Sequence, residues 1–317
     1  MDIVPLDFAA EPGRAAGYHA LAADAMAPGP RMPAHLFRLV AERGWRAMPA
    51  ENWLAVDDDR VVGGVTVHLP DRDNTHLALI RFLQVDPGHR RRGVGGALLS
   101  HVAERARAHD RSTMLVEVAE GGPGEAFVRA KGAREVATQA RRVLDLSTFD
   151  VPEREIPGYR LEFLRGRTPD PQIADMAALL EIMNDAPLDD LPVDEERWTA
   201  ADVAALEDAW TSIHQDVFTV VARAGDGSAA AFTRLFADTR EPAGWARQTD
   251  TAVRRDHRGR GLGLWVKEAN TAWLKRARPD LTRVITWNAV SNGPMVAINE
   301  RLGYRLLDVW HEWELRA

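Results

Sequence analysis

Cysteine is absent from the 317-residue sequence. Its absence excludes disulfide bonds, thiol nucleophiles and thiolate metal sites. Lysine is scarce, because Lys131, Lys267 and Lys275 are the only three in the chain, and arginine carries nearly all of the positive charge. The sequence also lacks an apolar run of about 18 residues, the length typical of a membrane span, and its N-terminus has no basic, then apolar, leader pattern. We therefore expect a cytoplasmic protein with no membrane partner.

An excess of positive charge is also absent, since the formal net charge is −7. Binding to nucleic acid needs clustered cations, whereas the arginines here are interleaved with carboxylates, so we expect no nucleic-acid partner. Apolar residues make up 45% and charged residues 27% of the chain, which are values typical of globular proteins. A chain of this length favours two domains of about 150 residues each.

A glycine-rich turn at residues 257–263 joins a strand-like segment that ends at Val253 to a helical pattern that begins near Gly261. Glycines allow successive backbone N–H groups to point into one concavity. The first turn of the helix adds unpaired donors and the positive end of the helix dipole. The pattern therefore predicts a pyrophosphate-binding cradle, with Arg258 and Arg260 supplying positive charge around it.

A second copy of this turn lies at residues 89–95. Gly93 and Gly261 are separated by 168 positions, and so are Val85 and Val253. Equal offsets across a strand end and a turn indicate an internal duplication. Neither copy has the Gly-x-Gly-x-x-Gly spacing of a dinucleotide fold or the Gly-Lys-Ser/Thr of a Walker loop, so both of those readings are disfavoured.

Both copies resemble the acyl-CoA-binding motif of the GCN5-related N-acetyltransferase (GNAT) family, Gln/Arg-x-x-Gly-x-Gly/Ala, read here as residues 90–95 and 258–263. The resemblance implies acetyl-CoA as cosubstrate and a small-molecule amine as acceptor. The residues that it implies for cofactor binding are Val85, Arg90, Arg91, Arg92, Gly93, Val94 and Gly95 in the first copy. In the second copy they are Val253, Arg258, Gly259, Arg260, Gly261, Leu262 and Gly263.

Strands alternate with helices along the chain, which predicts an α/β fold with a mixed α+β sheet. Together with the duplication, the resemblance implies two tandem GNAT-like domains. We expect residues 1–150 to form the first domain, with a closing strand near residues 141–146, and residues 151–317 to form the second. A charged, proline-containing linker is expected at residues 150–158. The pattern leaves monomer and homodimer open.

The second half also contains a strand, Asn, helix, Leu-Gly-aromatic order at residues 283–304, which resembles a later motif of the same family. The resemblance implies that Asn292 contacts the pantetheine arm; an N-cap role for Asn292 is an equal alternative. Residues 118–132 of the first half have a glycine-rich stretch instead. We therefore expect the second half to be catalytic and the first to bind CoA with little or no turnover.

Acyl transfer to an amine requires a neutral nucleophile, yet an amine with a pKa of about 10.4 is protonated at neutral pH, a cost of roughly 4.6 kcal/mol. In the resembled family a base often lies on the strand before the cradle, and Asp250 is the only carboxylate on that strand. Asp250 is the candidate base; the alternative is a residue that anchors the strand or pairs with Arg247.

Many family members carry a Tyr acid four residues before the glycine of the Leu-Gly-aromatic ending, but Asn299 and Val128 occupy those positions here. The resemblance therefore supplies no general acid, and Tyr304 is expected to be a core aromatic. No His, Asp and Glu spacing suggests a metal site, so no metal is expected. The prediction is an acetyl-CoA-dependent N-acetyltransferase. Acetylation of a cysteinyl sugar and a non-catalytic acyl-CoA-binding module remain alternatives.

Overall fold

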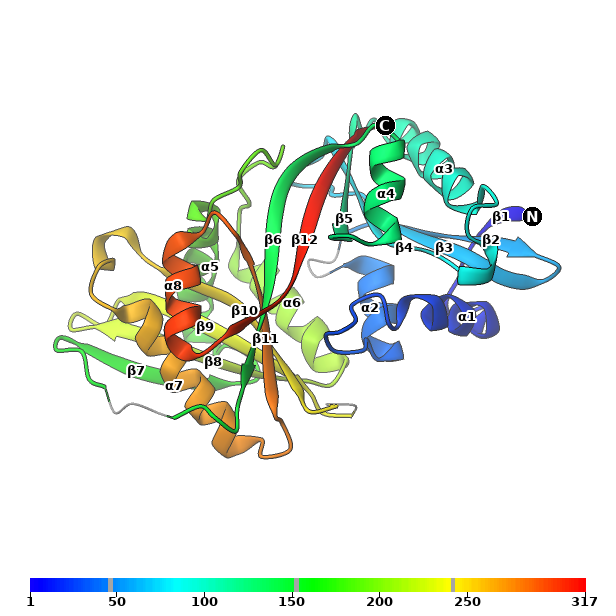
Figure 1. Ribbon diagram of the computed structural model, residues 1–317. Helices are drawn as coiled ribbons and strands as arrows, with labels where there is room; N and C mark the ends of the chain where they lie inside the picture. The colour runs from blue at the N-terminus through cyan, green and yellow to red at the C-terminus, as the bar shows by residue number, and fades with distance from the viewer. Residues whose placement is uncertain (45–47, 151–153, 241–242) are drawn as a thin grey trace. The chain divides into compact units, whose positions relative to one another are not determined.

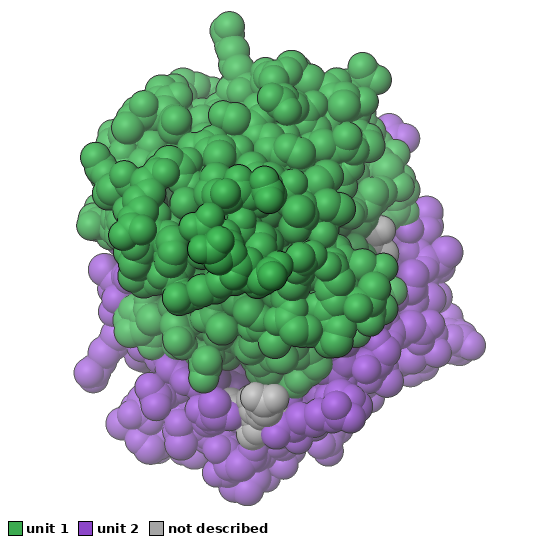
Figure 2. All heavy atoms as spheres, turned by 90° about the vertical axis from the view of Figure 1, so that its right-hand side faces the viewer, with its two compact units in different colours: residues 1–137, 190–194, 310–317 green, residues 138–189, 195–309 purple. Residues whose placement is uncertain are grey.

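The computed structural model describes residues 1–44, 48–150, 154–240 and 243–317. The chain forms two compact units (Figure 2). Unit 1 contains residues 1–137, 190–194 and 310–317, and unit 2 contains residues 138–189 and 195–309. Residues 151–153 of the linker expected at 150–158 lie outside the described residues.

Unit 1 is a mixed sheet with strand order β1-β2-β3-β4-β5-β12 and with helices on its two faces (Figure 1). The strands are β1 (Asp2–Pro5), β2 (Ala50–Asp57), β3 (Arg60–His68), β4 (Leu77–Val85), β5 (Thr113–Ala119) and β12 (Arg305–Arg316), of which residues 310–316 belong to unit 1. The helices are α1 (Pro12–Ala22), α2 (Ala34–Arg43), η1 (Pro87–His89), α3 (Val94–Ala108) and α4 (Pro123–Ala130). Apolar residues of α3 pack on the sheet, while Tyr18 of α1 lies close against Gly64 of β3.

Unit 2 repeats this layout with strand order β6-β11-β10-β9-β8-β7. The strands are β6 (Arg134–Asp145, of which residues 138–145 belong to unit 2), β7 (Tyr159–Arg165), β8 (Gln215–Ala224), β9 (Ala229–Asp238), β10 (Trp245–Val253) and β11 (Arg283–Ala289). The helices are η2 (Asp170–Gln172), α5 (Ile173–Glu181), η3 (Ile182–Asp185), α6 (Ala200–Ser212), η4 (Arg255–His257), α7 (Leu262–Ala277) and α8 (Gly293–Leu302). Buried residues of α7 pack with Val220 and Ala222, and those of α5 and α6 pack with Val221 on the opposite face.

The predicted mixed α/β fold and the internal duplication are confirmed element by element. Strand β10 lies 168 positions after β4 at both of its ends, and η4 lies 168 positions after η1. The offset grows to 170 for β11 relative to β5, which places a small insertion between the start of α7 and the start of β11.

The last strand of each half is exchanged. Residues 139–145 of β6 pair antiparallel with β11 inside unit 2, whereas residues 310–316 of β12 pair antiparallel with β5 inside unit 1. The closing strand expected near residues 141–146 therefore exists, and it belongs to the sheet of the second half. The compact units consequently do not follow a simple division at residue 150. The boundary predicted there, between residues 1–150 and residues 151–317, describes the two copies of the sequence repeat and stays a prediction.

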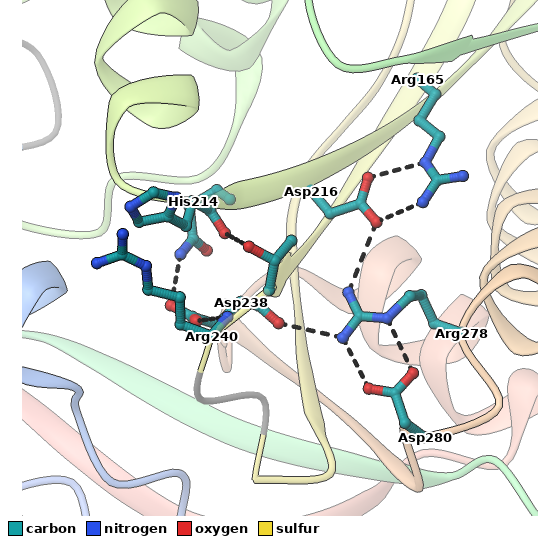
Figure 3. A network of polar contacts seen from close by, with 9 residues as sticks. Arg165, His214, Asp216, Asp238, Arg240, Arg278 and Asp280 are labelled. Carbon is teal, nitrogen blue, oxygen red and sulfur yellow. Dashed lines mark hydrogen bonds and ion pairs between the residues drawn. The ribbon is translucent and has the colours of Figure 1, made fainter.

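A polar network lies at one end of the unit 2 sheet, the end opposite the glycine turn (Figure 3). Arg165 donates two hydrogen bonds to Asp216, at 2.9 and 2.8 Å. Arg278, just after α7, lies 3.5 Å from the same carboxylate, pairs with Asp280 and donates to the Asp238 carbonyl. The network ties the C-terminal end of α7 to β7, β8 and β9, so the helix that carries the cradle is anchored at its far end.

Within the described part of the chain, every helix is too short or too polar to pass through a lipid bilayer.

Candidate active site

Each glycine turn lies beside an opening between two parallel strands. In unit 2 the pairing of β10 with β11 ends at Gln248 and Thr286, although the strands run on to Val253 and Ala289. In unit 1 the pairing of β4 with β5 ends at Ile80 and Val116 in the same way. The strands part there, and α7 or α3 begins at the mouth of the opening, which is the arrangement that the predicted cofactor cradle requires.

The glycines shape both turns. Gly93 and Gly261 are the N-caps of α3 and α7, with φ angles of 89° and 80°, a left-handed conformation that side chains disfavour. No side chain caps either helix, so first-turn N–H groups remain available to an anion. At Gly263 a Cβ atom would lie 3.2 Å from the Ile298 side chain and 3.4 Å from the Val253 side chain, so a larger residue there would have to displace Ile298 slightly.

The first arginine of each motif braces its turn by an equivalent hydrogen bond. Arg90 Nε donates to the Val85 carbonyl at 3.2 Å, and Arg258 Nε donates to the Val253 carbonyl at 3.0 Å. The next helical residues, Val94 and Leu262, are buried at 4% and 1% exposure. They face the core, so only their backbone N–H groups can serve the predicted cofactor.

The second cradle has a carboxylate neighbour that the sequence did not reveal. Asp185, at the end of η3, accepts hydrogen bonds from Arg255 Nε at 3.0 Å and from Arg258 Nη2 at 2.6 Å. The hydrogen bond from Arg255, with that from Arg258, holds the pKa of Asp185 below its usual range. Two of the cations beside this cradle are therefore already paired.

The remaining cationic groups also differ between the cradles. Arg260 donates to the hydroxyl of Tyr159, which lies 2.8 Å from Nδ1 of His257. In the first cradle, Arg91 and Arg92 make no hydrogen bond or ion pair with any described residue and are exposed. Their positive charge is available to a phosphate without displacing an internal partner.

Asp250 lies in a β-bulge at the point where β10 leaves β11. The register of β10 against β9 shifts between Gln248 and Thr251, so Thr249 and Asp250 together face Arg234. The residue is half-buried, and burial of its carboxyl group raises the pKa of Asp250, with Arg234 acting in the opposite direction. The electrostatic partner of Asp250 is thus Arg234 and not Arg247, which interacts with Asp238.

Arg234 is fully buried, and Glu207 holds its side chain in place. It donates to Glu207 Oε1 at 2.5 Å, and Glu207 also accepts hydrogen bonds from the Thr168 backbone and hydroxyl at 2.6 and 2.8 Å. The guanidinium lies 5.2 Å from the centre of the Trp210 ring, while its Nε and Nη1 atoms have no hydrogen-bond partner among the described residues. The cation beside Asp250 is therefore fixed in position.

Unit 1 has no titratable group at the equivalent position, where Phe82 occupies the bulge of β4. The Phe82 ring packs against Phe37 with 5.0 Å between centroids, and its carbonyl accepts a hydrogen bond from the Tyr18 hydroxyl at 3.1 Å. Aromatic side chains fill the space beside this bulge.

Asn292 caps α8, because its side chain accepts a hydrogen bond from the Met295 N–H at 3.2 Å. The N-cap role is confirmed, and its contact with pantetheine stays a prediction. Asn299, at the position of the missing Tyr acid, is buried and donates to Asn288 Oδ1 at 2.5 Å. Tyr304 is buried at 3% exposure, as expected for a core aromatic. No group of three or more metal-binding side chains occurs within residues 1–44, 48–150, 154–240 and 243–317.

Comparison with known proteins agrees with this geometry. The model of the acetyltransferase (GNAT) family matches residues 18–124. A mycothiol acetyltransferase from Kineococcus radiotolerans is 33% identical over 178 residues, which is 55% of this chain and 54% of that protein. The match thus spans about half the length of that curated relative.

Solved structures cover the whole chain. A tandem GNAT protein from the clavulanic acid biosynthesis pathway is 30% identical, with a TM-score of 0.83 over 99% of this chain and 98% of that one. A GCN5-related N-acetyltransferase from Sphaerobacter thermophilus is 16% identical with a TM-score of 0.69, a likeness of fold alone. Two equivalent cradles, two openings between strands and a full-length tandem relative lead to one conclusion. The chain belongs to the GNAT family of acetyltransferases, in its tandem form.

Proposed function

We propose that this protein transfers an acetyl group from acetyl-CoA to the amine of a small molecule, and that unit 2 carries out the reaction. The family's chemistry is acyl transfer, which supports the reaction class. The observation that carries the rest is the half-buried carboxyl group of Asp250, with its raised pKa, in the bulge beside the opening of β10 and β11. The acceptor amine arrives protonated, and a carboxylate with a raised pKa is better matched to removing that proton.

The backbone of the second cradle fits the diphosphate of a CoA thioester. Gly261 and Gly263 leave the turn without side chains, and the start of α7 offers uncapped N–H groups. With the diphosphate bound there, the opening between β10 and β11 leads toward Asp250. The neutral amine then attacks the thioester carbon directly, and holding the two reactants together supplies much of the rate enhancement.

Unit 1 is proposed to bind acetyl-CoA without turnover. Its cradle has the same backbone geometry, and Arg91 and Arg92 have no competing carboxylate among the described residues. However, Phe82 replaces the base, and Phe37 fills the neighbouring space. A bound acetyl group would find no proton acceptor in this bulge.

The test is release of free thiol from acetyl-CoA over a panel of small amines. Release that depends on an amine supports the enzyme, whereas binding of acetyl-CoA with no release for any amine supports a non-catalytic acyl-CoA-binding module. The likeness to a mycothiol acetyltransferase favours a cysteinyl sugar as one member of the panel. Efficient turnover of that sugar alone would make it the acceptor in place of the wider amine class.

A further inference from the structure

Helices α7 and α8 of unit 2 bury polar side chains at positions that are apolar in unit 1. The buried polar residues on α7, on α8 and just after α8 include Lys267, Asn270, Thr271, Asn299 and Tyr304. The repeat places Leu99, Val102, Ala103, Val128 and Ala133 at these positions in unit 1. Four of the polar side chains have an atom with no hydrogen-bond partner among the described residues, namely Asn270 Oδ1, Thr271 Oγ1, Asn299 Oδ1 and the Tyr304 hydroxyl.

Lys267 is the only amine among these residues. Its side chain is 1% exposed, and it forms no hydrogen bond or ion pair with the described residues. Its Nζ lies 5.5 Å from the centre of the Tyr304 ring. An unpaired buried lysine is costly, because the charged form loses its hydration. Leu99 shows that an apolar residue suits this helix position, so packing alone does not explain a lysine there.

Burial lowers the pKa of Lys267 to about 7, and it is the only cause of the shift. Strands β8, β9 and β10 and helix α8 pack against α7, and none of their described charged groups contributes to the shift. Tyr304 is the titratable side chain that Lys267 contacts, and burial raises the pKa of its hydroxyl. The adjacent Glu268 is engaged by Arg154 at 3.1 Å. Lys267 can therefore release its proton near neutral pH.

Lys267 also lies behind the cradle on the face that meets α8. It follows Gly263 by four residues, so both lie on one side of α7, about 6 Å apart along the axis. Gly263 touches Ile298 of α8 and Val253 at the end of β10. One helical turn after Gly263, the Lys267 side chain contacts the Tyr304 ring. The Tyr304 backbone N–H donates a hydrogen bond to the Asn299 carbonyl at 2.9 Å. Asn299 holds the position of the missing Tyr acid.

We propose that Lys267 is the proton donor for the thiolate that leaves during acyl transfer, acting through the buried polar side chains around Asn299. The proposal rests on the proposed function. Asp250 takes one proton from the acceptor ammonium and releases it to solvent. The neutral amine then attacks: the bond from its nitrogen to the acetyl carbon forms, and Asp250 takes the second proton from that nitrogen. The carbon–sulfur bond breaks, and the CoA sulfur takes a proton from the Lys267 ammonium. Asp250 then releases its proton to solvent and Lys267 regains one from solvent, so the products are an amide, free CoA thiol and one released proton.

The test compares Lys267→Met with the matched substitution Leu99→Met in unit 1. We expect Lys267→Met to bind acetyl-CoA within twofold of wild type and to unfold at the same or higher denaturant concentration. We expect its kcat to fall by about 100-fold, in the range typical of a lost acid–base group. Because a donor must be protonated, kcat of the wild type should fall above pH of about 7, and Lys267→Met should lose that alkaline limb. Leu99→Met should leave kcat and its pH profile unchanged.

A second measurement does not depend on turnover. Because the chain has three lysines, ¹³C-lysine labelling gives three side-chain signals, and the signal lost in Lys267→Met identifies Lys267. We expect it to titrate with a pKa of about 7, well below the usual range of a lysine. A Lys267 signal that titrates in the usual range of a lysine, or a Lys267→Met enzyme with wild-type kcat and alkaline limb, would overturn the proposal and leave the proposed function intact. A wild-type protein without amine-dependent thiol release would overturn both.

Discussion

Asp250 and Phe82 occupy equivalent positions in the two β-bulges, 168 residues apart. The two halves share strand order, helix start and glycine geometry, yet only the second half places a carboxyl group where its parallel strands separate. Asp250 faces a buried arginine, whereas Phe82 packs into an aromatic cluster. This difference, more than any difference in the cradles, assigns turnover to unit 2 in the proposed function.

Substitution of Asp250 by Asn should abolish most turnover while leaving acetyl-CoA binding intact. The base acts in its deprotonated form, so kcat of the wild type should be lost as pH falls through the raised pKa of this carboxyl. We expect kcat of Asp250→Asn to fall by about 100-fold or more, and its acidic limb to disappear. Steady-state kinetics between pH 5 and 9 provide the measurement. An unchanged acidic limb would remove Asp250 from the mechanism.

The same substitution has a second expected effect, on stability. A carboxyl group whose folded pKa is raised binds its proton more tightly in the folded state, so it costs stability at pH values above its unfolded pKa. Asp250→Asn removes that cost, and the variant should be more stable than wild type at pH 7. At pH 3, where both states are protonated, the difference should vanish. Denaturant unfolding at the two pH values checks this, and a less stable variant at pH 7 would mean that the pairing with Arg234 outweighs burial.

A glutamate at each glycine N-cap should separate the roles of the two cradles. Gly261→Glu puts a strained side chain at a φ of 80° and a negative charge beside the diphosphate, and it should abolish activity. Gly93→Glu makes the same change in unit 1 and should leave much of the activity. Gly261→Ala and Gly93→Ala control for backbone strain without charge. Equal losses of kcat/KM from the two glutamate variants would contradict the assignment of the halves.

Asp185→Asn should strengthen CoA binding at the second cradle, because it releases Arg255 and Arg258 from their carboxylate partner. Exposed ion pairs are worth roughly 0.2–1 kcal/mol, so we expect a gain of about two- to fivefold in affinity. Calorimetry in a Gly93→Glu background isolates this cradle. Asp256→Asn, which removes a pairing with Arg254, is the control and should have little effect. Weaker binding by Asp185→Asn would show that Asp185 orients the two arginines for phosphate.

The exchanged strand makes the C-terminus part of the core of unit 1. Trp313 on β12 is 1% exposed and packs with Ile80 and Val128. Trp313→Ala should therefore cost about 3–5 kcal/mol in the free energy of unfolding. Amide hydrogen exchange should report lost protection first in β5, which pairs with β12, and not in β8 of unit 2. Loss of protection confined to unit 2 would contradict the exchange.

The fold was largely predictable, because glycine turns, strand patterns and the 168-residue offset are local signals that repeat along the chain. Helix α7 begins one residue after the expected position and ends where Pro279 approaches. The strand exchange was not predictable, because β6 and β12 have the same local pattern whichever sheet they join. Only the three-dimensional pairing with β11 or β5 distinguishes the two outcomes.

The site was predictable as two cradles but not in its details. Arg234 and Asp185 lie far from the motifs in sequence, and their roles depend on a bulge and on the path of a loop. Lys267 could have been identified from the sequence, because aligning the two halves places it at the position of Leu99, on a helix face that is buried. A polar residue at a core position of an internal repeat is a mark of function that needs no structure to detect.

Calorimetric titration of the purified protein with acetyl-CoA tests the account most directly. The account predicts saturable binding that is weakened in Gly93→Glu and in Gly261→Glu and is lost when both changes are combined. Absence of heat and of saturation in the wild type, or undiminished binding in the double variant, would contradict it.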